Sequence, residues 1–289
     1  MTTASAANTG FKNSVFTLLF SAPDVLRSLY SALSGLPLPS AIPLSINTLE
    51  DALFMGRLND LSFEIDGKLI VLIEHQSTIN PNMPLRCLLY VARLYEKVMD
   101  NRQIYRSRLV SIPAVECFVL YNGEAPCEEE KVLKLSDAFM KAKELGAEGA
   151  ANLELKVKVV NINKGHNERM LKQCVELREY SEFVWRVREK RKLEEGLKEA
   201  VRKAARECIK EGILEVFLRE HSSEVINMLL EEWNMEDALR VKYEEGIEQG
   251  WRKGVRQIVQ NMVSKGVSID EAAEAAGLST GEIQSLLSE

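Results

Sequence analysis

The sequence RLNDLSFEIDGKLIVLIEHQST (residues 57–78) contains the pattern that decides the fold. Two apolar runs, roughly 57–65 and 68–75, are joined by the dipeptide Asp66–Gly67, which is a strong signal for a two-residue hairpin turn. The second run is a continuous series of leucine and β-branched residues, typical of a strand that is covered on both faces. The stretch therefore predicts a β-hairpin inside the core of a sheet.

Each arm of this hairpin carries a carboxylate, Asp60 within the first run and Glu74 at the end of the second. Soluble proteins keep carboxylates away from the buried positions of strands. One interpretation is that both acids are strand-end residues that face solvent. However, Glu74 follows directly on a buried run, so its carboxylate stands at the mouth of a core strand, where mixed sheets place binding sites.

Strand alternation predicts how these side chains point. Glu74 and Gln76 project from one face of the strand, His75 projects from the other, and Asp60 can lie across from Glu74. Mg²⁺ prefers oxygen ligands and takes one or two carboxylates together with several waters. We therefore predict that Asp60 and Glu74 are catalytic acids that share a divalent ion. Gln76 would orient water or a phosphate oxygen, and His75 would be a packed, hydrogen-bonded residue.

The rest of the first 190 residues predicts helices and strands in mixed order. Periodicity and apolar runs place these elements at 11–34 (helical, interrupted at Pro23), 85–100 (helix), 112–124 (buried strand), 153–163 (half-exposed edge strand) and 167–190 (helix). This order predicts an α/β fold with a mixed sheet that has helices on its faces.

Residues 191–289 are rich in glutamate, lysine and arginine and predict an all-helical tail, so we place a domain boundary near residue 190. In this tail Gly246, Gly250 and Gly254 recur every four residues, at a cost of about 0.8–1 kcal/mol each relative to alanine in a helix. Close approach of another helix, and hence a homo-oligomer, would offset that cost. A mobile low-complexity segment is the alternative.

The final residues predict a helical hairpin with capping boxes at Ser268–Glu271 and Ser279–Glu282 and Gly277 in the turn. The pattern is similar to a helix-turn-helix, but its second helix offers no lysine or arginine for phosphates. A packing or oligomerisation hairpin and a DNA-contact module both remain open.

Composition narrows the class of protein. The chain has 289 residues, of which 46% are hydrophobic and 28% charged, as in a globular protein, and its net charge of -6 argues against a globally basic nucleic-acid binder. No apolar run reaches the ~20 residues that span a bilayer, and no secretory signal opens the sequence. The five cysteines form neither a zinc motif nor a disulfide framework. We expect a cytoplasmic protein without membrane contact.

The stretch GRLNDLSFEIDGKLIVLIEHQSTINPNMPLRCLLYVARLYEKV (56–98) resembles the recombination-promoting nuclease / putative transposase family of the PD-(D/E)XK nuclease superfamily. The resemblance rests on the spacing from Asp60 to Glu74, on the helix start that contains Arg86 and Tyr90, and on the strand VLYNGE (119–124). The opening helix and the glycine-punctuated tail also resemble members of this group.

The resemblance implies a restriction-endonuclease-like mixed central sheet over residues 1–190, an all-helical C-terminal region, and a Mg²⁺- or Mn²⁺-dependent DNA endonuclease. Asp60 would be the metal-binding acid and Glu74 the second acid of the motif. Arg86 and Tyr90 would contact a DNA phosphate; a solvated stripe on their helix is the alternative.

The sequence departs from the superfamily pattern at three points. Gln76 stands where the superfamily has a lysine, and a neutral amide cannot neutralise developing charge. Asn59 stands where a proline precedes the first acid, and residues 11–20 contain no acid. A catalytically weak or inactive nuclease-fold protein that acts in DNA binding or assembly is therefore the rival hypothesis. A transposase that moves its own gene would have the same site.

Overall fold

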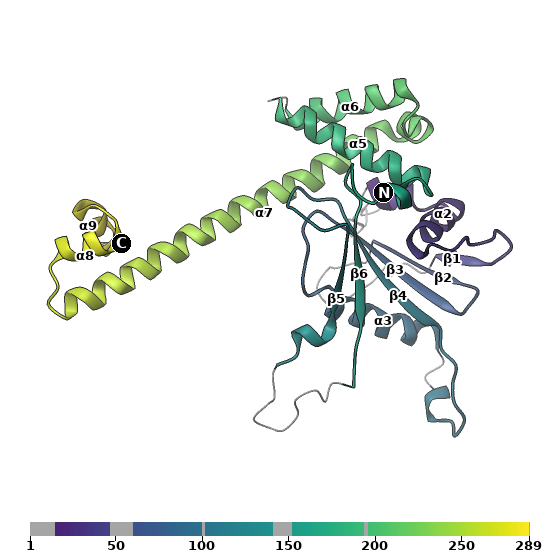
Figure 1. Cartoon of the computed structure of the whole chain (residues 1–289), viewed down its shortest axis with the longest axis horizontal. Helices are drawn as coiled ribbons and strands as arrows, with labels where there is room; N and C mark the ends of the chain where they lie inside the picture. Colours follow the sequence, from purple (N-terminus) through teal and green to yellow (C-terminus); the bar gives the residue numbers. More distant parts are fainter. Residues whose placement is uncertain (1–14, 47–59, 100–101, 141–151, 194–195, 289) are drawn as a thin grey trace, which may run out of the picture. The chain divides into compact units, whose positions relative to one another are not determined.

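The computed structural model describes residues 15–46, 60–99, 102–140, 152–193 and 196–288 (Figure 1). The helices and strands follow one another as α1 (Val15–Leu19), α2 (Pro23–Ser34), β1 (Leu44–Ile46), β2 (Leu61–Ile65), β3 (Leu69–Gln76), α3 (Met83–Val98), η1 (Gln103–Tyr105), β4 (Ala114–Tyr121), β5 (Glu130–Lys134), η2 (Leu135–Ala138), β6 (Lys156–Asn161), α4 (Glu168–Leu171), α5 (Val175–Lys192), α6 (Leu197–Glu211), α7 (Glu215–Ser264), α8 (Ile269–Ala276) and α9 (Thr280–Ser288).

The described strands form a single six-stranded mixed sheet with the order β1-β2-β3-β4-β6-β5. Strands β1, β2 and β3 are antiparallel neighbours, β4 is parallel to both β3 and β6, and β5 runs antiparallel to β6 at the far edge. Helix α3 provides the connection from β3 to β4. The predicted α/β fold, with a mixed sheet flanked by helices and a helical C-terminal region, is confirmed.

The predicted hairpin forms from β2 and β3. Both residues of its turn lie in the left-handed region, with φ of 51° at Asp66 and 64° at Gly67. Aspartate and glycine tolerate this conformation, which matches the twist of the paired strands. The register sets Leu61 opposite Ile73 and Ile65 opposite Leu69. Asp60 immediately precedes β2, so the prediction that it lies within the strand is wrong by one residue.

Helices cover the sheet from both sides. Alternate residues of β3, including Ile70 and Leu72, pack with α3 in a core that also takes in Val119 of β4 and Val159 of β6. The residues between them on β3 point to the opposite face, where His75 packs among aromatic residues of α1 and α5. Strand β3 is thus covered on both faces, as its continuous apolar run predicts.

Four details differ from the sequence prediction. Strand β6 is an internal strand, because β5 pairs with its outer edge. Strand β5 escapes prediction because its sequence, EKVLK, buries only one residue. Strand β1 is a three-residue strand that directly follows Pro43. The predicted helix 167–190 is two helices, α4 and α5, with an irregular link between them.

The C-terminal part of the chain is helical. Residues 1–229 and 230–289 form two compact units, and the predicted boundary near residue 190 falls inside α5. In the second unit, Val259 at the end of α7 packs with Ala272 and Ala273 of α8 and with Ile283 and Leu286 of α9.

Both predicted capping boxes of this unit form. The Ser268 hydroxyl accepts from the Glu271 backbone N–H while the Glu271 carboxylate accepts from the Ser268 backbone, and Ser279 and Glu282 repeat the arrangement. Gly277 follows α8 at the predicted turn, and its backbone lies in the left-handed region. Within the described part of the chain, none of the helices combines the length and apolarity that crossing a membrane requires.

Candidate active site at the end of the hairpin strands

The predicted acids lie at the same end of the hairpin. Glu74 and Gln76 lie at the carboxyl end of β3, and Asp60 stands just before the first residue of β2. Because Leu61 pairs with Ile73 in the antiparallel register, Asp60 is level with Glu74 across the two strands. The hairpin therefore brings together two acids that are 14 positions apart in the sequence.

Glu74 is buried and ion-paired. Its side chain is 5% exposed, and its Oε2 lies 3.1 Å from a terminal nitrogen of Arg86 on α3. The same nitrogen donates to the Tyr90 hydroxyl at 3.0 Å, so Arg86 links Glu74 and Tyr90 in one hydrogen-bonded group. Arg86 and Tyr90 are thus directed toward the sheet, and the alternative of a solvated stripe is wrong for these two residues.

The electrostatic interactions among Glu74, Arg86 and Tyr90 favour the charged form of the Arg86 guanidinium. Burial opposes the charge of Arg86, but the hydrogen bond to Tyr90 and the nearby Glu74 carboxylate outweigh burial and raise the pKa of Arg86. Burial, together with the negative charge of Glu74, raises the pKa of the Tyr90 hydroxyl. Tyr90 therefore remains a neutral donor and acceptor at neutral pH.

Asp60 is held by the backbone of the neighbouring strand. Its Oδ2 accepts a hydrogen bond of 2.7 Å from the backbone N–H of His75, the residue that follows Glu74. A hydrogen bond to an ionised carboxylate is among the stronger ones in proteins. This bond fixes the Asp60 carboxylate beside β3 although Asp60 itself is not part of a strand.

Gln76 lies on the same side of β3 as Glu74 and faces α3. Its amide nitrogen is 2.9 Å from the Met83 sulfur at the start of α3. Its Oε1 is buried and accepts no hydrogen bond from any residue that the structure describes. A buried amide oxygen without a donor costs free energy, unless a ligand or water supplies what is missing.

His75 points to the opposite face, as predicted. Its ring stacks on Phe16 with centroids 4.9 Å apart, and its Nε2 is 3.3 Å from the Tyr180 hydroxyl. Burial, aided by the positive charge of Arg188, lowers the pKa of His75 to about 4. The imidazole is therefore neutral at physiological pH and acts as a packing residue.

A second group of residues, which sequence reasoning missed, holds the end of β3 in place. The backbone N–H of Asn122, just after β4, donates to the Gln76 carbonyl oxygen at 2.9 Å. The guanidinium of Arg188 on α5 donates to the Asn122 side-chain oxygen at 2.9 Å, to the Asn122 carbonyl oxygen, and to Asn163 Oδ1 at 3.0 Å. We call Asn122, Gly123, Asn163 and Arg188 the edge clamp.

Gly123 explains why the edge clamp approaches β3 so closely. A Cβ at this position would overlap the carbonyl oxygen of Ser77 and the ring of Tyr121. The Asn-Gly pair within VLYNGE was a visible turn signal. No local signal could point to Arg188, which is 66 positions from Asn122 and lies in a charged run that resembles a solvated helix face.

The oxygen atoms at the carboxyl end of β3 suit a hard divalent cation. Asp60 and Glu74 offer carboxylates, and Gln76 offers a buried amide oxygen that has no donor among the described residues. Among those residues, no group of three or more histidine, cysteine or acidic side chains gathers as a metal cage. Two carboxylates completed by water is the usual protein contribution to Mg²⁺, so the donor set fits this ion.

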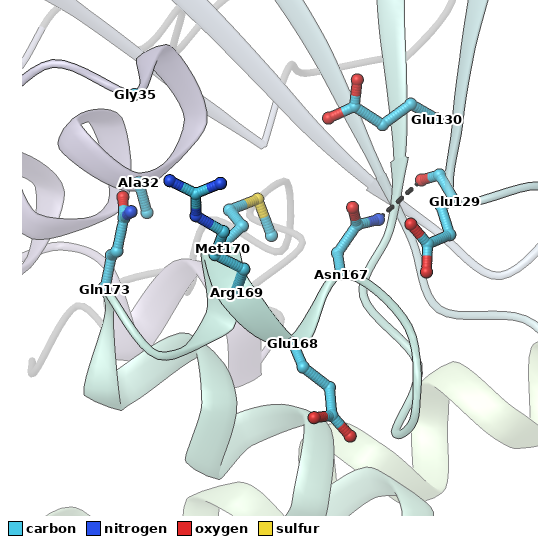
Figure 2. A pocket seen from close by; sticks show the side chains of 9 residues that line it. All are labelled: Ala32, Gly35, Glu129, Glu130, Asn167, Glu168, Arg169, Met170 and Gln173. Carbon is cyan, nitrogen blue, oxygen red and sulfur yellow. Dashed lines mark hydrogen bonds between the residues drawn. The ribbon is translucent and has the colours of Figure 1, made fainter.

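An open hollow of about 480 Å³ lies elsewhere in the first unit, between the end of α2, the start of β5 and α4. Its lining includes Glu129, Glu130, Glu168 and Arg169, and Figure 2 shows the Asn167 amide directed at the Glu129 carbonyl oxygen, 2.6 Å away. The hollow shares no lining residue with the hairpin site.

Comparison with known proteins gives one clear result. No curated protein and no solved structure matches the chain well enough to count as a relative. A family model does match: that of the family described as "Putative transposase, YhgA-like" matches residues 49–207, which is more than half of the chain and contains the hairpin, α3 and the edge clamp. The chain therefore belongs to this family of YhgA-like putative transposases.

Proposed function

We propose that this protein is a Mg²⁺-dependent DNA endonuclease that hydrolyses phosphodiester bonds at the end of the β2–β3 hairpin. The observation that carries the proposal is that Asp60, Glu74 and Gln76 lie at one strand end, where Arg86 of α3 pairs with Glu74 and donates to Tyr90. Membership of a transposase family supports DNA as the substrate. The restriction-endonuclease-like fold and the nuclease superfamily are part of the same proposal.

Each residue has a role that follows from its chemistry. Asp60 and Glu74 would hold the ion, and the bound ion would supply Lewis-acid activation of the phosphodiester. Gln76 would orient the attacking water, since an amide can both donate and accept a hydrogen bond. Arg86 can donate to a phosphate oxygen from its remaining N–H groups, with Tyr90 holding its guanidinium.

The edge clamp positions the site without touching the substrate. Its hydrogen bond from Asn122 to the Gln76 carbonyl oxygen fixes the backbone of the residue that would orient water. Arg188 in turn holds Asn122 through both its main chain and its side chain. Displacing a catalytic group by about 1 Å can cost a hundredfold in rate, so this support matters for the proposed reaction.

The direct test is nicking of supercoiled plasmid with Mg²⁺ by the native protein and by Asp60→Asn. The substitution keeps the shape and the hydrogen-bond acceptor of Asp60 but removes the charge that would hold the ion. We expect nicking by Asp60→Asn to fall by about a hundredfold or more, the scale of losing one charge-stabilising catalytic group.

Glu64→Gln provides the matched control, because it removes a carboxylate from the same hairpin within β2. Nicking by this variant should equal that of the native protein. Equal nicking by native protein and Asp60→Asn, or nicking that persists in EDTA, would contradict the proposal.

The rival function is DNA binding or assembly by a nuclease fold that no longer cuts. The specific observation in its favour is the Glu74–Arg86 ion pair, because the guanidinium already neutralises one of the two carboxylates. Gln76 adds no positive charge for the transition state. In this case Arg86 would bind DNA phosphates and the acids would serve only to hold Arg86.

Isothermal titration of the native protein with Mg²⁺ and Mn²⁺ separates the two functions. The endonuclease proposal expects one site per chain that is lost in Asp60→Asn and kept in Glu64→Gln. Absence of metal binding, together with DNA binding that Arg86→Met weakens, would favour the rival function.

A further inference from the structure

We propose that the outward face of α6 is a docking surface for the phosphate backbone of duplex DNA, which Lys198, Arg202 and Arg206 contact. Helix α6 belongs to the first compact unit, as the hairpin site does. The inference deepens the proposed function and rests on DNA being the substrate. It assigns the surface that holds the duplex beside the site, a task that the catalytic roles leave open.

The outward face of α6 carries cations at regular spacing. Lys198, Arg202 and Arg206 recur every four residues, and all three are exposed. At 100° per residue they fall within about 80° of the helix surface, and the exposed Lys210 continues the row. The buried residues of α6 lie on the other side of the helix, roughly 200–340° from Lys198 on the same scale. They are Ala200, Val201, Ala204, Ala205 and Cys208.

Two of the three acids of α6 are engaged by α5. The Glu207 carboxylate accepts from the Lys190 ammonium at 2.7 Å, and the Glu211 carboxylate accepts from the Arg186 guanidinium at 2.6 Å. The third acid, Glu199, is half-buried. The acids of α6 therefore serve mainly to fasten α6 to α5.

The cations of the outward face are left without such partners. We call Lys198, Arg202 and Arg206 the basic face. None of the three takes part in an ion pair with any residue that the structure describes. The whole chain carries a net charge of -6, so overall composition does not account for this local excess of positive charge. Like charges four residues apart on a helix repel one another, and an anion along the row relieves that repulsion.

The anion that fits the basic face is a polyanion with closely spaced charges. The row spans roughly 12 Å, and duplex DNA presents several phosphates over that length, since it carries one charge per about 1.7 Å of its axis. Helices that dock on anionic membranes also present large apolar side chains. No large apolar residue of α6 is exposed, so the face suits phosphates in solution. The match to a transposase family favours DNA as their source.

Helix α5 links the basic face to the hairpin site. Arg186 and Lys190 of α5 pair with α6. Between them on α5, Arg188 donates to Asn122, whose backbone N–H donates to the Gln76 carbonyl oxygen. Figure 1 shows α5 and α6 together beyond the carboxyl ends of β3 and β4. Packed helices lie about 8–10 Å apart, so the thickness of one helix separates α6 from the edge clamp.

The salt dependence of DNA binding tests the proposal. Fluorescence anisotropy of a labelled duplex three helical turns long is measured in EDTA over a range of NaCl concentrations, so that binding is observed without cleavage. The full-length variant Lys198→Gln, Arg202→Gln, Arg206→Gln removes three charges while glutamine keeps a similar helix propensity. Each lost phosphate contact lowers the slope of log K against log salt by about 0.9, so we expect this variant to lose about 2.7. Each single substitution should lose about 0.9.

Two matched controls accompany this variant. Lys97→Gln, Arg106→Gln, Arg108→Gln removes as many exposed charges near the amino end of β4, at the opposite end of the sheet from the hairpin site. Its salt slope should equal that of the native protein. Lys198→Arg, Arg202→Lys, Arg206→Lys keeps the charges of the basic face and should also bind with the native slope.

Several results would overturn the proposal. They are a native salt slope in the triple α6 variant, an equal loss of slope in the control at the opposite end, and a loss in the charge-preserving variant. Native protein that binds phosphatidylserine vesicles but not the duplex would overturn it as well.

The docking surface and the endonuclease can fail separately. Native protein that never nicks plasmid, but whose DNA binding loses its salt slope with the basic face, refutes cleavage and keeps the docking surface. Nicking that depends on Asp60, together with an unchanged slope in the triple α6 variant, refutes the docking surface alone.

Discussion

At the scale of single residues, the hairpin site is defined by a carboxylate that is buried in the core and paired with an arginine. Glu74 is placed in the core by the same apolar run that makes β3 a central strand, and Arg86 reaches it from the next helix. Removing one partner of a buried ion pair costs about 3–5 kcal/mol of folding stability. The Glu74–Arg86 pair therefore contributes to the stability of the folded protein, unlike most ion pairs on a protein surface. A sequence that only needed stability could use apolar residues at both positions.

His75 makes the stability of the fold depend on pH. Its pKa is lowered from 6.5 to about 4 in the folded protein, mainly by burial. The unfolded chain therefore binds a proton at a higher pH than the folded chain does. The stabilising contribution is fully present above about pH 6.5, declines as pH falls toward 4, and amounts to at most about 3.5 kcal/mol.

The measurement is urea unfolding of native protein and His75→Phe at pH 7 and at pH 4.5. Phenylalanine keeps a ring against Phe16 but does not titrate. We expect the native protein to lose more unfolding free energy than His75→Phe between these two pH values. An identical loss in both proteins would show that His75 is not the titrating group.

At the scale of secondary-structure elements, the site depends on how the turn after β4 meets the end of β3. The parallel pairing of β3 with β4 brings Tyr121 level with Gln76, and the chain then turns through Asn122 and Gly123 against Ser77. Helix α5 fixes this turn with the guanidinium of Arg188. Three elements far apart in the sequence thus define the position of one strand end.

Gly123→Ala tests this close approach. The added methyl group would overlap the Ser77 carbonyl oxygen, which belongs to the backbone and cannot rotate away. We expect a loss of about 1–3 kcal/mol in unfolding free energy, the usual cost of overpacking. If the protein nicks plasmid, nicking should fall as well, because the Gln76 backbone loses its support.

Gly196→Ala is the matched control for this substitution. Gly196 precedes α6 with φ of -54°, and a Cβ there would meet nothing within 4 Å among the described atoms. Its unfolding free energy should stay within about 0.5 kcal/mol of the native value. Equal stability of the Gly123 and Gly196 variants would mean that the turn has room to adapt.

At the scale of the whole molecule, the chain consists of two units with separate cores. The core between α3 and the sheet includes Tyr90, Val119 and Val159, all in the first unit, whereas Val259 and Ile283 belong to a core of the second unit. No residue is shared between these two clusters. The proposed active site lies in the first unit.

Cutting the chain after Leu229 should therefore leave the first unit folded. The fragment 1–229 retains the sheet and its helices, so we expect cooperative urea unfolding with a midpoint close to that of the first unit in the full chain. A fragment that is unfolded would contradict this division.

The sequence determined the hairpin and the faces of its strands. The Asp66–Gly67 turn, the apolar run of β3 and the two-residue repeat of strand side chains were enough to predict that Glu74 and Gln76 share a face and that His75 is packed on the other. These features are local, since each depends only on residues a few positions apart. The same reasoning predicted the capped helices of the terminal hairpin.

Only the tertiary structure decided which distant groups complete the site. It showed that β6 is internal, that Arg86 pairs with Glu74, and that Arg188 holds the turn at Asn122. The physical reason is that periodicity encodes which side of its own element a residue occupies, but not which other element packs there. The sequence pattern of a charged helical run is the same whether its arginine faces solvent or packs against the buried end of a strand.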